Sequence, residues 1–415
     1  MPELRSIILA AGKGTRMKSA IPKVLHAVCG QPILRYVLDV SRAAGARKTY
    51  VVVGHQADAV RDFVGAAAEV IEQTQLLGTA DAVRRVVPFL KNFSGDVLIL
   101  CGDAPLLEKP TIRALVNRHR RADAVCTVLS AEVADPAGYG RIVRDNAGEI
   151  MAIREHQDAD SRERKIPEIN VGVYCVRSRD LLRALSGVTF NGRKKEFYLT
   201  DIVAILRQAK LKVQAVKIRD SREGLGINTR RDLALAQKVM GGKILQAFMD
   251  NGVTLVDPVN TYIGHDVKIG RDTVIQPFVY IDHDVRIGKD CQIGPFCRLR
   301  PGTRLGDRVQ IGNFGEVSRS GFGDQSVMKH FGFVGDTRIG KNVNIGAGFV
   351  TANYDGKSKN KTVIGDKAFI GSNSTVVAPV NIAAQAVLGA GSVLTQGRKI
   401  PAGKVAVGVP ARVVR

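Results

Sequence analysis

An aliphatic residue at every sixth position constrains the C-terminal half of this chain more than any other feature of the sequence. The uninterrupted run is Ile263, Ile269, Ile275, Ile281, Ile287, Ile293, Leu299, Leu305, Ile311 and Val317. Glycine follows directly behind many of these residues, and a small or β-branched residue stands four positions after most of them. This period fits neither an amphipathic helix nor a hairpin sheet, and it is typical of a parallel β-helix built from hexapeptide repeats.

Two segments interrupt the period. Ser318–Met328 precedes a short second phase at Phe333, Ile339 and Ile345, and the polar loop Ala352–Lys361 follows that phase. The period then resumes at Ile364, Ile370, Val376, Ile382, Leu388, Leu394 and Ile400. Loops that leave a rigid solenoid are common positions for binding groups, so we expect binding residues in these two segments.

The first half of the chain follows a different pattern, in which short β-branched runs alternate with helical periodicity. The expected strands are Ser6–Ala10, Lys48–Val53, Val97–Cys101 and Ala124–Leu129, and the expected helices are Ile33–Ala44, Gly78–Val87 and Thr111–Arg120. This alternation predicts an α/β, doubly wound, mostly parallel sheet of Rossmann-like type, with ligands beyond the carboxyl ends of the strands. Two further strands, Val143–Ala152 and Ile169–Val176, are expected to lie over the ligand site.

The two patterns predict two domains joined by a helix. We expect the α/β domain over residues 1–228, a linker helix over 229–250 and the β-helix over 251–415. The linker carries an apolar stripe at helical spacing, formed by Leu233, Ala236, Met240, Ile244 and Phe248.

Composition excludes several classes of protein. The net charge is +22, from 61 Lys and Arg against 39 Asp and Glu, but the basic residues are spread along the chain, which disfavours a nucleic-acid-binding protein. The six cysteines form no CxxC pair and have no histidine cluster, so buried thiols are expected rather than zinc ligands. No apolar run is long enough for a membrane span or a secretion signal. We therefore expect a soluble, cytoplasmic protein without a membrane partner.

The loop Leu9–Met17 follows the first expected strand and combines glycines with two cations. It is neither a P-loop nor a dinucleotide-binding motif, because Ile7 and Met17 stand where those motifs require glycine. Backbone N–H groups at the start of a helix bind phosphate, and Lys13 and Arg16 add positive charge. The sequence therefore predicts a phosphate-binding turn.

Asp103 follows the continuously apolar strand Val97–Cys101. A lone aspartate after a strand is often only a helix N-cap. Beside a phosphate-binding loop, however, a carboxylate at the end of a buried central strand is well placed to hold Mg²⁺, which also binds waters and substrate phosphates.

A series of short motifs in both halves carries a resemblance to one family. In order along the chain they are LAAGKGTRM, IPKVLH, QLLGTADA, GDAPLL, DPAGYGRI, Glu155-His156, EINVG, GIN, RLRPG, IGNF, NVNIGAG and NYDG. Together they resemble the bifunctional N-acetylglucosamine-1-phosphate uridyltransferase and glucosamine-1-phosphate N-acetyltransferase family (GlmU) over nearly the whole chain. The resemblance implies a left-handed β-helix with three hexapeptides per coil, a homotrimer, and a role in supplying UDP-N-acetylglucosamine for cell-wall and lipopolysaccharide synthesis.

The resemblance implies uridylyl transfer in the first half, in which N-acetylglucosamine 1-phosphate attacks the α-phosphorus of UTP. The implied nucleotide contacts are Leu9, Ala10, Ala11, Gly12 and Lys13, with Gln73, Gly78 and Thr79 on the uracil. The implied catalytic cations are Arg16 and Lys23, and the implied Mg²⁺ ligands are Asp103 and Asn228. Gly140, Glu155 and Asn170 are implied to bind the sugar phosphate.

The resemblance implies acetyl transfer from acetyl-CoA to glucosamine 1-phosphate in the second half. His330 falls on the general base, which fits a neutral imidazole near its intrinsic pKa. Arg300, Asn344 and Lys359 are implied to bind the acceptor. Ala347, Asn353, Tyr354, Ser372 and Ala390 are implied to bind acetyl-CoA.

The second half departs from the family pattern in several places. Ser318 stands where the family has a lysine, and Phe333 stands where it has a tyrosine. Arg319 is the nearest replacement for the lysine, although adjacent residues on a strand face opposite ways. The C-terminal sequence VAVGVPARVVR offers no equivalent of the family's CoA-binding arginine, and the β-helix is about one coil shorter before RLRPG.

Two alternatives remain open. In one, which the departures favour, the chain is a monofunctional sugar-1-phosphate nucleotidyltransferase whose β-helix only forms oligomers, regulates activity or acetylates a different acceptor. In the other, which the dispersed charge disfavours, the chain is a nucleic-acid-binding scaffold.

Overall fold

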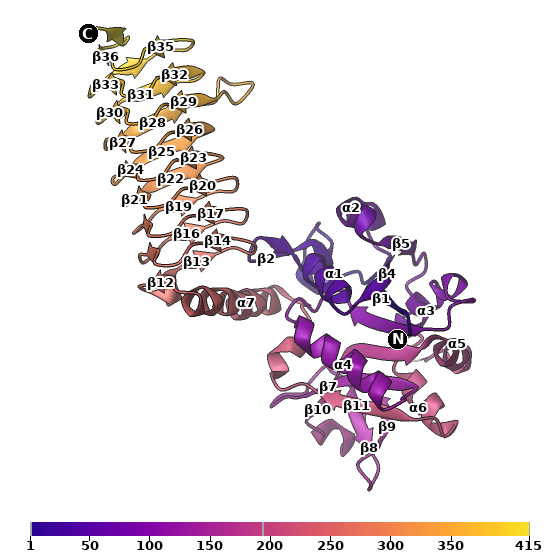
Figure 1. The fold of residues 1–415 in the computed structure, drawn as a ribbon. Helices are drawn as coiled ribbons and strands as arrows, with labels where there is room; N and C mark the ends of the chain where they lie inside the picture. Colours follow the sequence, from indigo (N-terminus) through magenta and orange to yellow (C-terminus); the bar gives the residue numbers. More distant parts are fainter. Residues whose placement is uncertain (1, 193–194, 415) are drawn as a thin grey trace. The chain divides into compact units, whose positions relative to one another are not determined.

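The computed structural model describes residues 2–192 and 195–414 and divides into two compact units, Met1–Val239 and Met240–Arg415. Helix α7 (Arg230–Asp250) contributes residues to both units (Figure 1). In the first unit Ala236 of this helix is buried, and in the second unit Leu245 joins the core of the β-helix. No helix in the described part of the chain is long and apolar enough to cross a membrane.

The first unit is built on one sheet with the strand order β11-β7-β10-β6-β1-β4-β5 (Figure 1). Its strands are β1 (Leu4–Ala10), β4 (Ala46–Val53), β5 (Glu69–Glu72), β6 (Asp96–Cys101), β7 (Cys126–Glu132), β10 (Glu168–Arg177) and β11 (Val213–Lys217). β1 pairs in parallel with both β4 and β6, as expected for a doubly wound sheet. A separate two-stranded hairpin consists of β2 (Ala27–Val28) and β3 (Gln31–Pro32).

Helices cover both faces of this sheet because the buried strands are apolar on both sides. They are α1 (Ile33–Ala43), α2 (Ala57–Val64), α3 (Thr79–Arg84), α4 (Lys109–Arg121), α5 (Ser178–Gly187) and α6 (Asp201–Gln208). Consecutive residues of β1 point to opposite faces, so Ile7 packs in the cluster with α3, α5 and α6. Its neighbour Ile8 packs in the cluster with α1, α2 and α4. The expected helix Gly78–Val87 is present but ends early, at Arg84.

The expectation that Val143–Ala152 and Ile169–Val176 lie over the ligand site is wrong. The second segment is β10, which lies inside the main sheet, antiparallel to β6 on one side and to β7 on the other. The first segment is a hairpin of β8 (Arg141–Arg144) and β9 (Ile150–Arg154), which extends from β10. Local periodicity identified β10 as a strand but contains no information on its neighbours.

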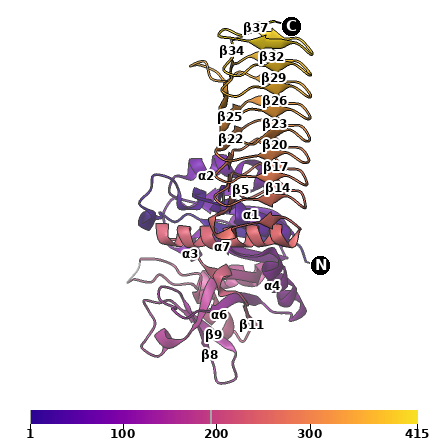
Figure 2. The same cartoon turned by 90° about the vertical axis from the view of Figure 1, so that its left-hand side faces the viewer.

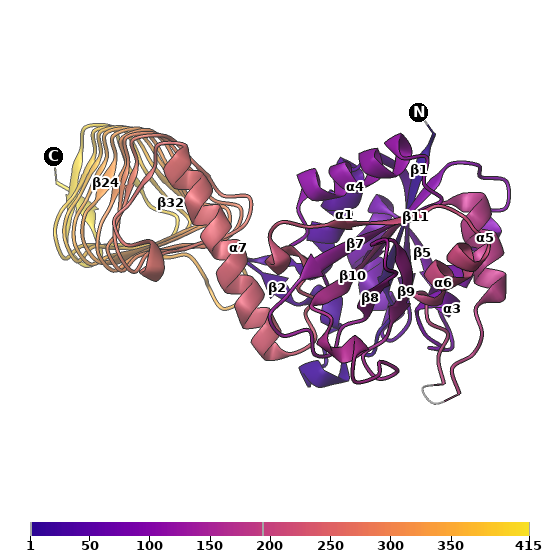
Figure 3. The same ribbon diagram turned by 90° about the horizontal axis from the view of Figure 1, so that it is seen from below.

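The second unit is a parallel β-helix, as the six-residue period predicted. Figure 3 shows its triangular outline, and Figure 2 shows its stacked coils. Three sheets form its sides. The inward aliphatic residues form one continuous buried cluster along the helix, which is its core. The recurring glycines have a steric cause: a Cβ on Gly270 would come within 2.6 Å of the Lys289 backbone nitrogen on the next coil.

The sheets are named here in the order in which each coil passes through them. The first sheet comprises β12 (Thr254–Leu255), β15 (Val274–Ile275), β18 (Gln292–Ile293), β21 (Gln310–Ile311), β24 (Val327–Met328), β27 (Asn344–Ile345), β30 (Phe369–Ile370), β33 (Val387–Leu388), β36 (Val405–Val407) and the antiparallel β37 (Arg412–Val413). The second comprises β13 (Tyr262–Ile263), β16 (Tyr280–Ile281), β19 (Arg298–Leu299), β22 (Gly315–Ser318), β25 (Gly332–Gly335), β28 (Phe349–Ala352), β31 (Thr375–Val377) and β34 (Val393–Leu394). The third comprises β14 (Lys268–Ile269), β17 (Arg286–Ile287), β20 (Arg304–Leu305), β23 (Gly321–Phe322), β26 (Thr337–Ile339), β29 (Thr362–Ile364), β32 (Val380–Ile382) and β35 (Lys399–Ile400). The turn from the first to the second sheet is called the first corner, and the turn from the second to the third is called the second corner.

The expected interruption at Ser318–Met328 does not exist. The coil continues with one residue fewer, because the inward position passes from Val317 to Phe322, which pairs with Leu305 and is buried. The assignment of Phe333 as an inward residue is also wrong, because Val334 pairs with Val317 and is fully buried. The polar loop Ala352–Lys361 does leave the helix, between β28 and β29, with Tyr354 bridged to Lys359.

Candidate active sites

A cleft of about 540 Å³ opens at the carboxyl ends of β1 and β6. Most residues predicted for the nucleotide half line it, namely Leu9, Ala10, Ala11, Gly12, Lys13, Arg16, Lys23, Gln73, Gly78, Thr79, Asp103 and Asn228. Parallel pairing brings the loops that follow β1 and β6 together, since Gly102 donates its N–H to the Leu9 carbonyl at 2.9 Å. A Cβ on Gly102 would stand 2.9 Å from the same oxygen, so this close approach requires glycine.

A cluster of two cations and two oxygen ligands lies in the wall of this cleft. Lys23 Nζ donates to the Asp103 carboxylate and to Asn228 Oδ1, the latter at 3.1 Å. Arg16 Nη2 donates to the same Asn228 oxygen at 2.9 Å. Ile227 fixes the approach of this segment by donating its N–H to the Asp103 carbonyl at 2.9 Å. Residues separated by more than 200 positions therefore form one group.

The oxygens of Asp103 and Asn228 fit a divalent cation. Both already converge on a single positive group, the Lys23 ammonium. Carboxylate and amide oxygens are the ligands that Mg²⁺ prefers, and the ion completes its coordination with waters and substrate phosphates. No group of three or more His, Cys, Asp or Glu side chains suited to a metal occurs within residues 2–192 and 195–414. A metal at Asp103 and Asn228 would therefore depend on water and substrate oxygens for the rest of its shell.

The deeper end of the cleft is built around Gln73, which is almost completely buried. Its amide nitrogen donates to the Gly78 carbonyl at 3.1 Å and to Asp81 Oδ2 at 2.8 Å. Both amide hydrogens are thereby used, so the carbonyl oxygen of Gln73 is the group left to accept a hydrogen bond from a ligand. Asp81 was not among the predicted residues, although it belongs to the QLLGTADA motif.

Gly78 and Thr79 are fixed by the segment around Phe197. Gly78 has φ of +98°, and a Cβ at this position would stand 2.5 Å from the Phe197 carbonyl oxygen. The Thr79 hydroxyl accepts the Leu199 N–H at 3.0 Å. Backbone geometry and sterics therefore both require glycine at position 78.

The three residues predicted to bind the sugar, Gly140, Glu155 and Asn170, are not among those that line the cleft. Asn170 donates its backbone N–H to the Gly140 carbonyl at 2.8 Å, and its side chain donates to the Tyr174 hydroxyl at 2.7 Å. Glu155 accepts the Thr200 hydroxyl at 3.0 Å, and burial raises the pKa of its carboxyl group.

Cys101 connects these three predicted sugar-binding residues to the cleft. Its thiol lines the cleft and donates to the Gly172 carbonyl at 3.4 Å. Gly172 is in turn held by the Asn170 side chain, which accepts its N–H at 3.0 Å. Burial raises the pKa of Cys101 to about 12, so this thiol is not a nucleophile at neutral pH.

In the β-helix, pairing register sorts the predicted residues into two columns. His330, Ala347, Ser372 and Ala390 each stand two residues after inward residues that are paired coil to coil, so they form one column at the first corner. Arg300 and Asn353 lie at the second corner, as do Tyr354 and Lys359 in the polar loop. Asn344 is exposed on β27 of the first sheet. A single chain therefore does not bring His330 and Arg300 together, because they lie at different corners of the coil.

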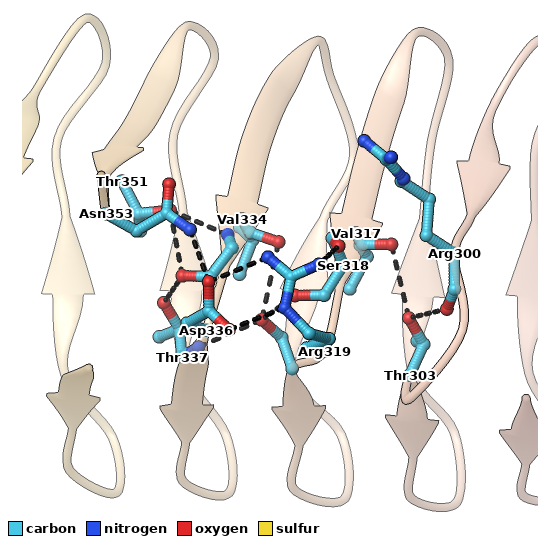
Figure 4. A network of polar contacts seen from close by, with 12 residues as sticks. Arg300, Thr303, Val317, Ser318, Arg319, Val334, Asp336, Thr337, Thr351 and Asn353 are labelled. Carbon is cyan, nitrogen blue, oxygen red and sulfur yellow. Dashed lines mark hydrogen bonds and ion pairs between the residues drawn. The ribbon is translucent and has the colours of Figure 1, made fainter. Parts of the chain in front are cut away.

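The second corner holds a polar network centred on Asp336 (Figure 4). Arg319 donates from Nε and Nη2 to the two carboxylate oxygens, at 2.7 and 2.8 Å. Asn353 Nδ2 donates to the same carboxylate. The Arg319 guanidinium holds the pKa of the Asp336 carboxyl below its usual range. Asp336, which sequence reasoning missed, therefore fixes the amide of a predicted site residue.

The expectation that Arg319 faces away from position 318 is wrong. β22 ends at Ser318, and Arg319 adopts a left-handed backbone with φ of +47°. The turn carries its guanidinium back over the preceding residue, where Nη1 donates to the Ser318 hydroxyl at 2.9 Å (Figure 4). The other predicted arginine at this corner, Arg300, is half-exposed and donates to Glu316 at 2.9 Å.

Comparison with known proteins agrees with both halves. Residues 6–171 match the model of the MobA-like NTP transferase domain, and residues 284–319 match that of the bacterial transferase hexapeptide repeat. Residues 361–396 match the hexapeptide repeat of succinyl-transferase. The bifunctional protein GlmU of Pelotomaculum thermopropionicum is 45% identical over 411 residues, which cover 91% of this chain and 90% of that protein. The GlmU proteins of Listeria innocua and Brevibacillus brevis are each 41% identical over 429 residues, or 95% of this chain and 94% and 93% of theirs.

The chain belongs to the GlmU family. The fold is accordingly a nucleotidyltransferase unit followed by a left-handed β-helix of hexapeptide repeats. The GlmU resemblance inferred from the motifs is therefore confirmed over 91–95% of the chain.

We predict that Gly78→Ala destabilises the first unit by about 2–4 kcal/mol, because the new Cβ adds a steric clash to an unfavourable backbone angle. Chemical denaturation followed by circular dichroism measures this loss. Gly138→Ala is the matched control, since Gly138 has φ of +83° but a Cβ added there would meet no atom within 4 Å. Equal losses for the two variants would contradict the proposed close contact with Phe197.

We predict that Glu155→Gln raises the free energy of unfolding relative to the unmodified chain, and that this gain grows as the pH rises from 4 to 7. Burial raises the pKa of Glu155 in the folded state above its unfolded value of about 4.3, so ionisation opposes folding once the pH exceeds that value. Glutamine keeps the oxygen that accepts from Thr200 and removes the charge. Melting temperatures across this pH range test the trend, with Glu149→Gln, a largely exposed position, as the control. A difference independent of pH would refute it.

Proposed function

We propose that the two units catalyse consecutive steps in the synthesis of UDP-N-acetylglucosamine. The second unit transfers the acetyl group of acetyl-CoA to the amine of glucosamine 1-phosphate. The first unit then joins N-acetylglucosamine 1-phosphate to UTP and releases pyrophosphate. The observation that carries this proposal is membership of the GlmU family over both units, together with a cleft that gathers three cations and two oxygen ligands.

In the first unit, catalysis consists of positioning and charge neutralisation, and no covalent nucleophile is needed. Lys13, Arg16 and Lys23 bind the triphosphate, and the Gln73 carbonyl oxygen accepts the uracil N–H. Asp103 and Asn228 would hold Mg²⁺, and the ion would supply positive charge to offset that of the phosphates. Lys23 donates to both Asp103 and Asn228, and these contacts hold its ammonium group in the wall of the cleft that would receive the phosphates.

The sugar phosphate enters beside the nucleotide, where Gly140, Glu155 and Asn170 hold the N-acetylglucosamine. The Glu155 carboxyl and the Asn170 amide supply an acceptor and a donor for sugar hydroxyl groups. The contact of Cys101 with Gly172 keeps this group adjacent to the α-phosphate position in the cleft.

In the second unit His330 acts as the general base that takes a proton from the attacking amine. Arg300, Asn344 and Lys359 bind the acceptor phosphate and sugar, and Asn353 presents its amide oxygen to acetyl-CoA while Asp336 holds its nitrogen. Ala347, Ser372 and Ala390 form the column beneath His330 along which acetyl-CoA extends, and Tyr354 closes the loop side of the site.

A homotrimer completes the acetyl-transfer site, because His330 and Arg300 lie at different corners of one coil. The first corner carries a column of half-exposed phenylalanines, Phe278, Phe296, Phe314 and Phe331. Phe296 stacks on Phe278 with ring centroids 4.9 Å apart, and on Phe314 at 5.5 Å. An exposed apolar column beside a catalytic histidine is the kind of surface that another copy of the chain covers.

A cytoplasmic location follows from these proposed reactions, because their nucleotide and coenzyme substrates occur in the cytoplasm. The six cysteines are all unpaired, which suits a reducing compartment. The product is a precursor of peptidoglycan and lipopolysaccharide.

Incubation of the purified protein with glucosamine 1-phosphate, acetyl-CoA, UTP and Mg²⁺ tests the proposal. Thiol release reports acetyl transfer, and pyrophosphate release reports uridylyl transfer. We predict that His330→Ala abolishes thiol release and leaves pyrophosphate release from N-acetylglucosamine 1-phosphate unchanged, and that omission of Mg²⁺ abolishes pyrophosphate release. Absence of thiol release from the unmodified protein would support the alternative, a nucleotidyltransferase whose β-helix has another role.

We predict that Asp336→Asn lowers kcat/KM for acetyl transfer by about ten- to a hundredfold, because Arg319 and Asn353 lose the charged acceptor that fixes them. The readout is thiol release at varied glucosamine 1-phosphate, with pyrophosphate release unchanged. Asp324→Asn is the matched control, since this aspartate pairs with Lys341 at 2.9 Å on a neighbouring turn of the helix. Equal effects of the two variants would mean that Asp336 has only a structural role.

A further inference from the structure

A column of cationic side chains runs along the third sheet of the β-helix, on the strands β14, β17, β20 and β26, which are labelled in Figure 2. Lys268 pairs in register with Arg286, and Arg286 with Arg304. The next two rungs are Gly321 and Arg338. Neighbouring strands lie about 4.8 Å apart, and like charges at directly paired positions repel one another. This repulsion opposes folding unless an anion offsets it.

Part of this column borders a groove of about 420 Å³ over the strand that carries Gly321. Arg286, Arg304 and Arg338 stand around the groove, and the side chains of the described residues that line it include no carboxylate. Asp284 binds Arg304 from outside the groove, at 2.5 Å. Arg286 and Arg338 form no side-chain hydrogen bond or ion pair with any residue in the described ranges.

The groove exists because position 321 has no side chain. The backbone conformation at this position does not require glycine. Gly321 has no left-handed φ, and a Cβ built there would meet only the Arg304 carbonyl oxygen, at an ordinary 3.8 Å. Other glycines of the β-helix are sterically necessary, such as Gly270. An outward side chain would fit at position 321 and would separate Arg304 from Arg338. The β-helix fold therefore does not itself require the opening between these arginines.

We propose that this groove binds an oligophosphate, a linear anion with at least two phosphate groups. Arginine binds phosphate oxygens in a bidentate manner, and arginines on successive rungs can contact successive phosphates. Phe322, the one aromatic residue among the described residues of the lining, is buried and faces the core, so the groove offers no surface on which a base can stack. Recognition is therefore of the phosphate chain itself, and a nucleotide adds no further contact. None of the lining residues is assigned to either transfer reaction.

Isothermal titration calorimetry of the full chain with inorganic tripolyphosphate, without Mg²⁺, tests this site. The double variant Arg286→Gln and Arg338→Gln should bind one fewer tripolyphosphate per chain, or bind it at least about tenfold more weakly at that site. Its rate of pyrophosphate release from UTP should be unchanged, which separates this site from the nucleotide cleft. ADP should bind the groove no more tightly than inorganic pyrophosphate.

Gly321→Glu is a second variant, which adds an outward side chain and deletes no existing side-chain contact. Its carboxylate should pair with the flanking arginines, raise the melting temperature and abolish the same binding event. Lys399→Gln, on β35 of the same sheet but outside the groove, should bind tripolyphosphate as the unmodified chain does. The proposal is overturned if both groove variants bind normally, or if orthophosphate and sulfate bind as tightly as tripolyphosphate. It is also overturned if Gly321→Glu changes the oligomeric state in sedimentation, since the face would then be an interface between copies.

Discussion

Parallel strand pairing determines which side chains can meet in both units. In the first, the pairing of β1 with β4 and β6 places the loop after β1 beside Asp103, and the hydrogen bond from Ile227 to the Asp103 carbonyl adds Asn228 to the same edge. In the second, the pairing of each coil with the next places corresponding residues of successive coils above one another. A functional residue therefore belongs to a column at one corner, and its neighbours are the residues in register with it on the adjacent coils.

The charges at the two sites are balanced in different ways. In the nucleotide cleft, Arg16 and Lys23 share one oxygen of Asn228, and the single carboxylate of Asp103 does not neutralise both cations. The cleft thus retains positive charge for a substrate that carries several negative charges. At the second corner of the β-helix, Arg319 is neutralised by Asp336 and Arg300 pairs with Glu316, and Lys359 adds a further cation in the polar loop. The Arg319 guanidinium is therefore already paired with a carboxylate before a ligand binds.

The sequence predicted much of this arrangement, and the failures have identifiable causes. The six-residue period predicted the inward residues up to Val317, but counting in sixes cannot detect the loss of a single residue, so Phe322 and Val334 were missed. The central position of β10 was missed because strand order depends on pairing between distant segments. Asp336 and the reversed direction of Arg319 were missed because Arg319 has a left-handed backbone, a conformation that is uncommon for arginine.

Residues beside the inward positions of the β-helix can change without cost to its core, and this separation accounts for the departures at Ser318 and Phe333. The inward residues on either side of these positions, Val317 and Val334, keep their pairing and full burial. The outward residues make only local contacts, so an exchange there alters the charge and hydrogen bonding of the surface while the stacking of coils is unaffected. The same reasoning applies to the third sheet, where arginines on adjacent rungs increase the repulsion between coils without disturbing the buried Leu305, Phe322 and Ile339 beneath them. A column of cationic side chains is compatible with a stable β-helix because the buried core supplies the free energy of folding. Residues on the surface can then be selected for the ligands that they bind.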